Sequence, residues 1–274
     1  GHANLLGGRA WRYELFPFVS AELKDMHLLH ALNHGLIPVH YFETDQMYKR
    51  TLQSYVQDYL REEVFAEGLA RNIPAFSRFL DAVGYAHGEL INYANIAREC
   101  GVDAKTVKEY YQILVDTLLG CFVEPFKKRQ SRDVISKANK FYLFDVGIAG
   151  SLCKRTLTEE RGEQFGRALE HFILLEIRAY RSYTSGDFDI RFWRTKSGLE
   201  TDFILGDAEI AIEIKSARLV DKSDLHGIKA FIQSRKPRAA YVVANERAPR
   251  ITDGIRILPW HIFLSELWNG SIIK

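Results

Sequence analysis

Two neighbouring segments in the last third of the chain alternate between apolar and polar residues. Residues 200–205 and 209–215 both follow this period of two, which is typical of strands that pack one face on a core. Gly206 and Asp207 lie between them, and glycine adopts the positive φ of a tight turn at little cost. The pattern predicts a β-hairpin whose apolar face carries Phe203, Leu205, Ile210, Ile212 and Ile214.

The polar face of this hairpin gathers acids around one lysine. A two-residue turn would pair Leu205 with Ala208, Phe203 with Ile210, Asp202 with Ala211 and Glu200 with Glu213. Glu200, Asp202, Glu213 and Lys215 would then project from the same side. Clustered carboxylates suit a divalent cation such as Mg²⁺, and Lys215 beside it would polarise a water or neutralise a phosphate. The alternative is a solvated face on which Lys215 simply pairs with Glu213.

Residues 162–183 have the pattern of a long amphipathic helix with one acid on its apolar stripe. Glu170 shares that stripe with Gly166, Ile173, Leu174 and Ile177, so its carboxylate would point toward the sheet. A carboxylate on a buried stripe is a candidate functional group. The alternative is a buried ion pair, for example with an arginine.

The last segment, 151–274, alternates helices and strands. After the helix at 162–183 come a strand at 187–195, the hairpin, a helix at 223–235, strands at 238–245 and 254–260, and a helix at 261–269. This αβββαβ order predicts a mixed sheet with helices on its faces. The fold class is therefore α/β, of the mixed α+β kind.

The middle segment, 71–150, has a helix-turn-helix pattern over residues 91–119. Ala97, Gly101 and Val107 have the spacing that lets two helices approach, turn and anchor, and Asp103 can cap the second helix. Strand-like residues 121–126 and 139–145 follow, with a basic loop between them. A winged helix is the predicted structure.

Basic residues of this winged helix form a candidate nucleic-acid interface. They lie on the exposed side of the second helix and in or beside the wing, where they would contact phosphates. The candidates are Lys105, Lys108, Lys127, Lys128, Arg129 and Arg132, with Lys137 and Lys140 also near the wing. A solvated basic loop, or a winged helix used for protein contact, is the alternative.

The first segment, 1–70, is mostly helical. The pattern predicts a strand at 13–19, a helix at 24–35 ending at Gly35, and a long helix at 45–65 capped by Thr44. Three histidines, His27, His30 and His34, fall on one side of the first helix. No accompanying HExxH or carboxylate pattern supports a metal site, so a solvated helix edge is the favoured interpretation.

The composition and the net charge bear on the type of partner and the cellular location, but they do not identify a function. The formal net charge of +2 gives no global signal for nucleic acid, so any such signal must be local. The three cysteines fit neither a disulfide framework nor a zinc spacing, which favours a reducing, cytoplasmic location. The longest apolar runs are too short to span a membrane, and no signal peptide is evident.

The acids and the lysine together resemble the PD-(D/E)-X-K nuclease superfamily, which has the restriction-endonuclease-like fold. The matching residues are Glu170 on the leading helix, Asp202 on the second strand, and Glu213 and Lys215 on the third. Thr201 stands where the motif has proline, a position that varies in the superfamily. The resemblance implies that Glu170, Asp202 and Glu213 bind Mg²⁺ and that Lys215 is catalytic. Glu200 would be a further ligand or only a neighbour.

A wider resemblance covers nearly the whole chain. The segments "GHANLLGGRAWRYELFPFVSAEL", "NKFYLFDVGIAGSL", "FGRALEHFILLEI" and "GIRILPWHIFLSEL" are similar to a prokaryotic family of predicted AAA-type ATPases. Its members carry a P-loop core, a winged helix and a C-terminal domain of nuclease-like fold. This chain has no GxxxxGK[ST] motif. The resemblance implies the C-terminal part of a longer protein, with 1–70 as an ATPase-lid remnant and ATP bound only by the full-length protein.

Three functions follow as hypotheses. The first is a Mg²⁺-dependent nuclease whose winged helix positions the nucleic acid, DNA in preference to RNA. The second is an inactive nucleic-acid or protein docking module regulated by the ATPase. The third is an assembly element of an ATPase ring, with homo-oligomers forming through the missing core. None of the three involves a membrane.

Overall fold

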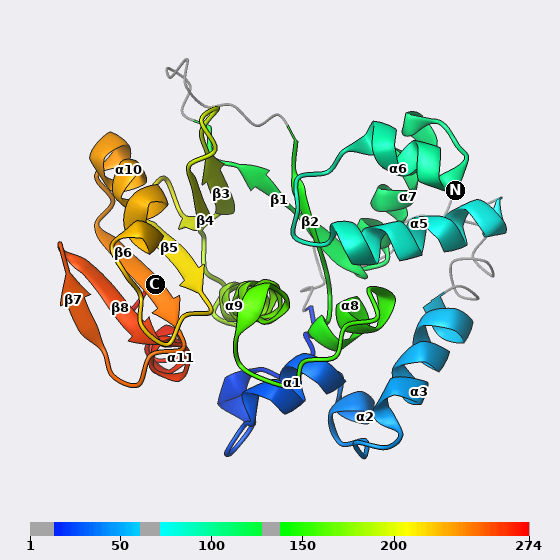
Figure 1. The fold of residues 1–274 in the computed structure, drawn as a ribbon, viewed down its shortest axis with the longest axis horizontal. Coiled ribbons are helices and arrows are strands. Elements are labelled where there is room, and N and C mark those ends of the chain that lie inside the picture. The colour runs from blue at the N-terminus through cyan, green and yellow to red at the C-terminus, as the bar shows by residue number, and fades with distance from the viewer. Residues whose placement is uncertain (1–13, 61–71, 128–137, 274) are drawn as a thin grey trace, which may run out of the picture.

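The computed structural model describes residues 14–60, 72–127 and 138–273. One mixed sheet of eight strands organises this part, in the order β2-β1-β3-β4-β5-β6-β8-β7 (Figure 1). The strands are β1 Gly120–Pro125, β2 Lys140–Leu143, β3 Ile190–Arg194, β4 Glu200–Leu205, β5 Ile210–Lys215, β6 Ala239–Ala244, β7 Arg250–Thr252 and β8 Ile255–Pro259. The predicted mixed α+β class is confirmed.

Strands of the predicted winged helix and of the C-terminal segment share this sheet. β1 pairs with β2 antiparallel and with β3 parallel, which joins the two segments edge to edge. β5–β6 and β6–β8 are the other parallel pairs. The short β7, which the sequence pattern did not predict, pairs antiparallel with β8. Side chains from the two segments therefore meet where β1 and β2 adjoin the rest of the sheet.

Helices cover both faces of the sheet. α9 (Gly162–Tyr183) and α11 (Trp260–Trp268) pack on the face that carries Phe203 and Ile212. α10 (His226–Arg235), which follows a short 3₁₀ turn (Ser223–Leu225), packs on the face that carries Ile204. Figure 1 shows α9 near the centre of the molecule, between β5 and α8 (Val146–Leu152). Because both faces are covered, five of the six residues of β5 are buried.

The helix-turn-helix has the predicted form. α5 (Ile73–Ala86), α6 (Tyr93–Cys100) and α7 (Ala104–Asp116) pack together. Gly101 ends α6 with a left-handed φ of +68°, and Val107 is fully buried. Asp103 caps α7 by accepting a hydrogen bond from the Thr106 N–H at 2.7 Å. An antiparallel β1–β2 pair follows α7, and the residues that connect its two strands, 128–137, lie outside the described residues.

The N-terminal segment corrects two predictions. The described residues of the predicted strand at 13–19 form no strand, and a 3₁₀ turn follows at Ser20–Glu22. The helix predicted at 45–65 begins at Tyr48 with Met47 as its N-cap, so Thr44 is not the cap. This helix, α3 (Tyr48–Ser54), gives way to a π-helical segment at Tyr55–Leu60. The rest of the predicted helix lies outside the described residues.

The first helix, α1 (Leu28–His34), ends at Gly35 as predicted and is followed by α2 (Pro38–Tyr41). Gly35 has a φ of +81°, which favours glycine. The solvated-edge interpretation of the three histidines is wrong for His34. Its side chain is buried and stacks on the ring of Tyr48, with 4.0 Å between the ring centroids.

The β4–β5 hairpin forms with a different turn. Gly206–Glu209 make a four-residue loop in place of the predicted two-residue turn. Phe203 pairs with Ile212 and Leu205 with Ile210, a shift of two residues from the predicted register. A shift of two keeps every side chain on its face, because the side-chain period of a strand is two. The predicted apolar face therefore survives the wrong register.

Candidate active site

An acidic cavity of about 270 Å³ opens between the end of the hairpin, α9 and β2. We use this name for the space lined by His87, Gly88, Glu89, Lys140, Tyr142, Arg167, Glu170, Glu200, Asp202, Glu213 and Lys215. Three separate elements thus bring together all four residues of the predicted nuclease motif. Glu200, named in the sequence as a ligand or a neighbour, lines the same space.

The backbone pairing between β4 and β5 ends directly before their acidic residues, Asp202 and Glu213. The β4–β5 ladder pairs Phe203 with Ile212, and Asp202 lies just beyond this pair. There the Asp202 carboxylate accepts a hydrogen bond from the Ile214 N–H at 2.7 Å. A side-chain oxygen thus satisfies a backbone donor of β5. β4 also carries an irregularity in its pairing with β3 between Arg191 and Trp193. Both features turn Asp202 toward the cavity.

Glu213 is the most deeply enclosed acid of the cavity wall. One carboxylate oxygen, Oε1, lies 2.7 Å from the Lys215 Nζ, as the pairing alternative predicted. The other, Oε2, is buried and has no hydrogen-bond partner among the described residues. Only 5% of the residue is exposed, so the face is not solvated there. Burial raises the pKa of Glu213 to about 7, although Lys215 opposes this shift.

Asp202 is also held in an environment that disfavours its charge. Burial raises the pKa of Asp202 well above its usual range, and the nearby carboxylates of Glu213 and Glu170 add to this shift. Lys140 and the Ile214 N–H oppose it. For Lys215, burial lowers the pKa, but the attraction of Glu213 and Asp202 outweighs burial and raises it. These charges are strongly coupled, which is common at functional sites.

Lys140 corrects a sequence prediction. It was assigned to the phosphate-binding strip beside the wing, but its side chain points inward from β2 and only 5% of the residue is exposed. Its Nζ lies 2.7 Å from Glu200 Oε1 and 3.3 Å from Glu170 Oε1. Burial lowers the pKa of Lys140, but Glu170, Tyr142 and Glu200 outweigh burial and raise it well above its usual range. Lys140 is therefore a charged counter-ion of the acidic cavity.

Glu170 and Glu200 both have cationic partners already. The Tyr142 hydroxyl donates a short hydrogen bond to Glu170, which also faces Lys140. The buried ion pair proposed from the sequence is therefore present, with a lysine in place of an arginine. Glu200 pairs with Lys140 and, at 2.6 Å, with Arg194. Two cations on one carboxylate make Glu200 a neighbour of the site and a poor metal ligand.

Sequence reasoning missed His87, Tyr142 and Arg167 on the cavity wall. The His87 Nδ1 accepts a hydrogen bond from the Leu143 N–H, and burial lowers the pKa of His87 well below its usual value, with His171 adding to the shift. Arg167 pairs with Glu89 and, one turn away on α9, with Glu163. Arg167 stands three residues before Glu170, so its helical spacing was a usable signal. No pattern in the sequence around His87 predicts that this residue lines the cavity.

The donor set of the cavity fits a magnesium ion. Mg²⁺ binds carboxylate oxygens and keeps several waters, so it needs one or two free carboxylates and room. The unpartnered Oε2 of Glu213 supplies a buried oxygen, and Asp202 and Glu170 line the same space. Lys140 and Lys215 supply the positive charge that balances these acids.

Of the predicted nucleic-acid residues that the structure describes, Lys105, Lys108 and Lys127 do not line this cavity. Lys105 and Lys108 are exposed on α7, where Lys108 lies over the ring of Tyr93. Lys127 is exposed after β1. Lys128, Arg129, Arg132 and Lys137 lie outside the described residues. The structure thus places one part of the proposed interface on the exposed side of α7, as the sequence indicated.

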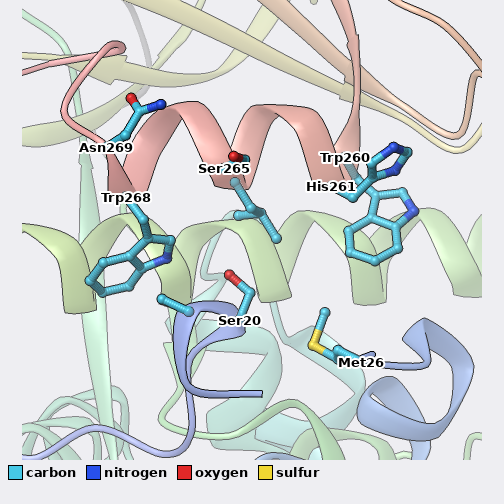
Figure 2. A pocket seen from close by; sticks show the side chains of 9 residues that line it. Ser20, Met26, Trp260, His261, Ser265, Trp268 and Asn269 are labelled. Carbon is cyan, nitrogen blue, oxygen red and sulfur yellow. The ribbon is translucent and has the colours of Figure 1, made fainter. Parts of the chain in front are cut away.

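A second cavity, of about 540 Å³, lies between α11 and the N-terminal segment. Figure 2 shows Trp260 and Trp268 of α11 on the side that faces Ser20 and Met26. Its one ionisable lining residue is His261, so the cavity lacks a catalytic constellation. The nearby Glu176 is buried, and it accepts hydrogen bonds from Ser20 and Trp268. Burial raises the pKa of Glu176 to about 7.

Among the described residues, no helix combines the length and the apolar character that a membrane span requires.

Comparisons with known proteins match two segments of the chain. Residues 27–159 match a domain of unknown function, DUF8612, and residues 165–263 match another, DUF4143. Two uncharacterized proteins, Mb2031c of Mycobacterium bovis and Rv2008c of Mycobacterium tuberculosis, are each 24% identical over 214 residues. That alignment covers 75% of this chain but 46% of each relative, so the chain spans about half their length. No solved structure matches the chain. The acidic cavity takes residues from both matched segments, since Lys140 lies in the DUF8612 match and Glu170, Asp202, Glu213 and Lys215 lie in the DUF4143 match.

Proposed function

We propose that the acidic cavity is the metal-dependent active site of a nuclease-like domain that acts on nucleic acid. The observation that carries the proposal is the buried Oε2 of Glu213 beside Asp202 and Lys215, an oxygen to which no described residue donates a hydrogen bond. A buried carboxylate oxygen that accepts no hydrogen bond destabilises the folded state unless a cation binds it. Glu213 lies where the pairing of β4 with β5 ends, and Glu170 faces the same cavity from α9. The order of Glu170, Asp202, Glu213 and Lys215 along the chain matches that of the PD-(D/E)-X-K motif.

Each residue of the motif has a distinct role in this proposal. Asp202 and Glu213 would hold Mg²⁺, and Glu170 would contribute directly or through a water. The ion would stabilise charge on the scissile phosphate and make a bound water more acidic. Lys215 lies beside Glu213 and is only partly exposed, which suits it to orient the attacking water and to balance developing negative charge.

Lys140 sets the charge balance of the same site. It is bound to Glu170 and Glu200, so it compensates two acids that would otherwise repel an approaching phosphate. A metal ion at Asp202 and Glu213 would leave this pair of contacts in place. Lys140 belongs to β2 of the winged helix, so movement of that module would change the charge of the cavity.

The winged helix supplies the proposed contact with nucleic acid. Lys105 and Lys108 lie on the exposed side of α7, the second helix of the helix-turn-helix, where such units meet phosphates or bases. We propose that the whole protein is a AAA-type ATPase. Its missing core would bind ATP and form homo-oligomers, and would regulate access to the cavity.

A second candidate is a docking module without catalytic activity. The specific observation in its favour is that Lys140 and Lys215 already pair with three of the cavity's carboxylates. In that case the acids would hold β2 against α9 and β4. The winged helix would then bind nucleic acid or protein under the control of the ATPase.

Cleavage assays separate the two candidates. Linear, branched and single-stranded DNA and RNA are incubated with Mg²⁺ or Mn²⁺ and either the wild type or Lys215→Ala. The nuclease proposal expects cleavage by the wild type and a loss of about 10²–10³-fold in Lys215→Ala, a magnitude typical of removing one charge-stabilising group. Lys229→Ala is the matched control, because Lys229 pairs with Asp253 and does not line the acidic cavity.

Each outcome of the cleavage assay supports or contradicts a specific part of the nuclease proposal. A wild type that cleaves none of the substrates contradicts the nuclease proposal and favours the docking module. Full cleavage by Lys215→Ala contradicts the role of Lys215. A salt series on nucleic-acid binding then tests the interface, because true phosphate contacts weaken steeply as salt rises.

A further inference from the structure

We propose that His30, His34 and Asp45 form a transition-metal site that is separate from the acidic cavity and independent of the nuclease proposal. The two histidines belong to α1, and Asp45 precedes α3. One potential ligand atom of each residue lies within 4.8 Å of those of the other two. Two segments of the chain thus converge on a single point with two imidazoles and one carboxylate.

Helical spacing brings the two imidazoles together. His30 and His34 are four residues apart, which places them on the same face of α1, one turn from each other. Their rings stack with 3.8 Å between centroids and an interplanar angle of 29°. The same spacing presents two histidines to one zinc ion in helical metal sites. The Asp45 Oδ1 lies 3.0 Å from the Nε2 of His34 and supplies the third potential ligand atom for a metal ion.

Contacts around the rings resemble those of metal ligands. The Nε2 of His30 lies 2.7 Å from the backbone oxygen of Tyr41, which can only accept, so this nitrogen carries the proton. The Nδ1 of His30 then keeps its lone pair. Metal-bound histidines commonly donate their second ring N–H to a carbonyl, which fixes the orientation of the ring.

The environment of His34 keeps its ring available to a metal. Its side chain is buried between His30 and Tyr48, and its Nε2, which faces Asp45, is the nitrogen that a metal ion shared with Asp45 would use.

The surrounding space leaves a metal ion with open coordination positions. The cluster faces a cavity of about 550 Å³, which Asn33, Tyr48, Lys49 and Thr156 also line. Three protein ligands plus water or another small ligand is the arrangement typical of non-structural zinc sites. Two imidazoles and one carboxylate favour Zn²⁺, Ni²⁺ or Co²⁺ over Mg²⁺, which prefers oxygen donors alone. Lys49 is the charge that would repel the ion.

Metal binding would tie α1 to the segment that precedes α3. Asp45 meets α1 only through His34 among the ion pairs of the described residues, and its side chain is 88% exposed. A metal ion would convert this single contact into a three-residue link. Any ligand that binds the folded state and not the unfolded state raises the unfolding temperature.

The test is calorimetric titration of the untagged chain with Zn²⁺ and, separately, Co²⁺. The variants are His30→Ala and Asp45→Asn, since neither residue is buried and both changes should leave the fold intact. His261→Ala, a histidine on α11 outside the cluster, is the matched control. All titrations are repeated in an Asp202→Asn/Glu213→Gln background, so that metal in the acidic cavity is not counted.

The proposal expects one equivalent of Zn²⁺ per chain in the Asp202→Asn/Glu213→Gln background. His30→Ala and Asp45→Asn should each weaken the affinity by at least about tenfold, while His261→Ala changes nothing. The wild type should also melt at a higher temperature with Zn²⁺, and Co²⁺ should show the visible absorption of nitrogen-bound cobalt. Absence of stoichiometric binding, or binding that both cluster variants retain, overturns the proposal. Neither result bears on the nuclease assay.

Discussion

The acidic cavity and the basic face of α7, formed by Lys105 and Lys108, use lysine in opposite ways. In the cavity, Lys140 is 5% exposed and holds two carboxylates at 2.7 and 3.3 Å. On α7, the side chain of Lys105 is 87% exposed, and its only ion pair among the described residues is with Glu109, at 3.9 Å. The same residue type is thus a fixed internal counter-ion in one region and a solvated charge in the other.

This difference decides what each region can do. Removing charges from water is costly, so the cavity keeps its lysines and acids in fixed contact, and a change to one group alters the pKa of the others. The exposed lysines are screened by salt and interact weakly with their neighbours. They remain free to meet phosphates. The cavity is suited to chemistry, and the face of α7 to binding.

The largest expected effect is on the stability of a Lys140→Met variant. Loss of this ammonium leaves Glu170 and Glu200 as partly buried carboxylates with fewer partners, so unfolding should become easier by about 3 kcal/mol in the absence of metal. Lys105→Met is the matched control and should change the free energy of unfolding by less than about 0.5 kcal/mol. Urea unfolding measures both. Equal effects in the two variants would erase the contrast between the regions.

The second prediction concerns how much the buried acids of the cavity destabilise the folded state. Burial raises the pKa of Glu213 to about 7 from a usual 4.5, so the folded state binds more protons than the unfolded state in between. Glu213 should therefore lower stability as the pH rises from about 4.5 through about 7. Glu176, whose pKa burial also raises to about 7, contributes in the same direction. Four buried histidines, whose pKa values burial lowers from 6.5, oppose this trend up to about pH 6.5: His34, His40, His87 and His171.

Replacing the two cavity acids should remove their part of this decline. Asp202→Asn/Glu213→Gln keeps oxygens that can accept from the Ile214 N–H and from Lys215. We expect it to be more stable than the wild type by about 2 kcal/mol at pH 8 without divalent metal. The remaining slope combines Glu176 with the opposing buried histidines. Urea unfolding at pH 5 and pH 8 checks this, and a double variant less stable at both values would contradict it.

Metal affinity should depend on pH for the same reason. A proton on Glu213 competes with the metal, and with a pKa of about 7 this carboxyl is mostly protonated at pH 6. Mn²⁺ should therefore bind about tenfold more tightly at pH 8 than at pH 6. Calorimetry in buffers of matched ionic strength measures this change. An affinity that is flat over this range would place the metal elsewhere.

The smallest expected effect belongs to the basic face of α7. Lys105→Ala and Lys108→Ala should each weaken DNA binding modestly and lower the slope of log affinity against log salt by about one. Neither change should alter metal binding in the cavity. Fluorescence anisotropy at several salt concentrations provides the measurement. Lys24→Ala, on the N-terminal segment, is the control, and an equal effect there would remove α7 from the interface.

Periodicity in the sequence was enough to predict most elements of the last two segments. Residues 162–183 form α9 with the predicted bounds, and the apolar face of the hairpin is the predicted one. The turn length was wrong, but a two-residue shift preserves the faces of both strands, so Asp202 and Glu213 still reach one cavity. The pattern of faces survives errors in the register.

Long-range contacts explain what the sequence did not reveal. Lys140 looked like part of a basic wing, because its neighbours in sequence are basic, but the β1–β3 pairing carries β2 to the cavity. His34 looked like part of a solvated helix edge, because helical spacing cannot tell which face another segment covers. Each depends on where separate segments meet, which local patterns do not encode.

The most direct test of the central claim is calorimetric titration of Mg²⁺ and Mn²⁺ into the wild type and Asp202→Asn/Glu213→Gln. Asp253→Asn/Glu266→Gln is the matched control, because it removes two acids that pair with surface cations elsewhere. We expect one ion bound per chain in the wild type and the control, and none in the cavity variant. Absence of binding in the wild type, or binding that the cavity variant retains, would contradict a metal site formed by Asp202 and Glu213.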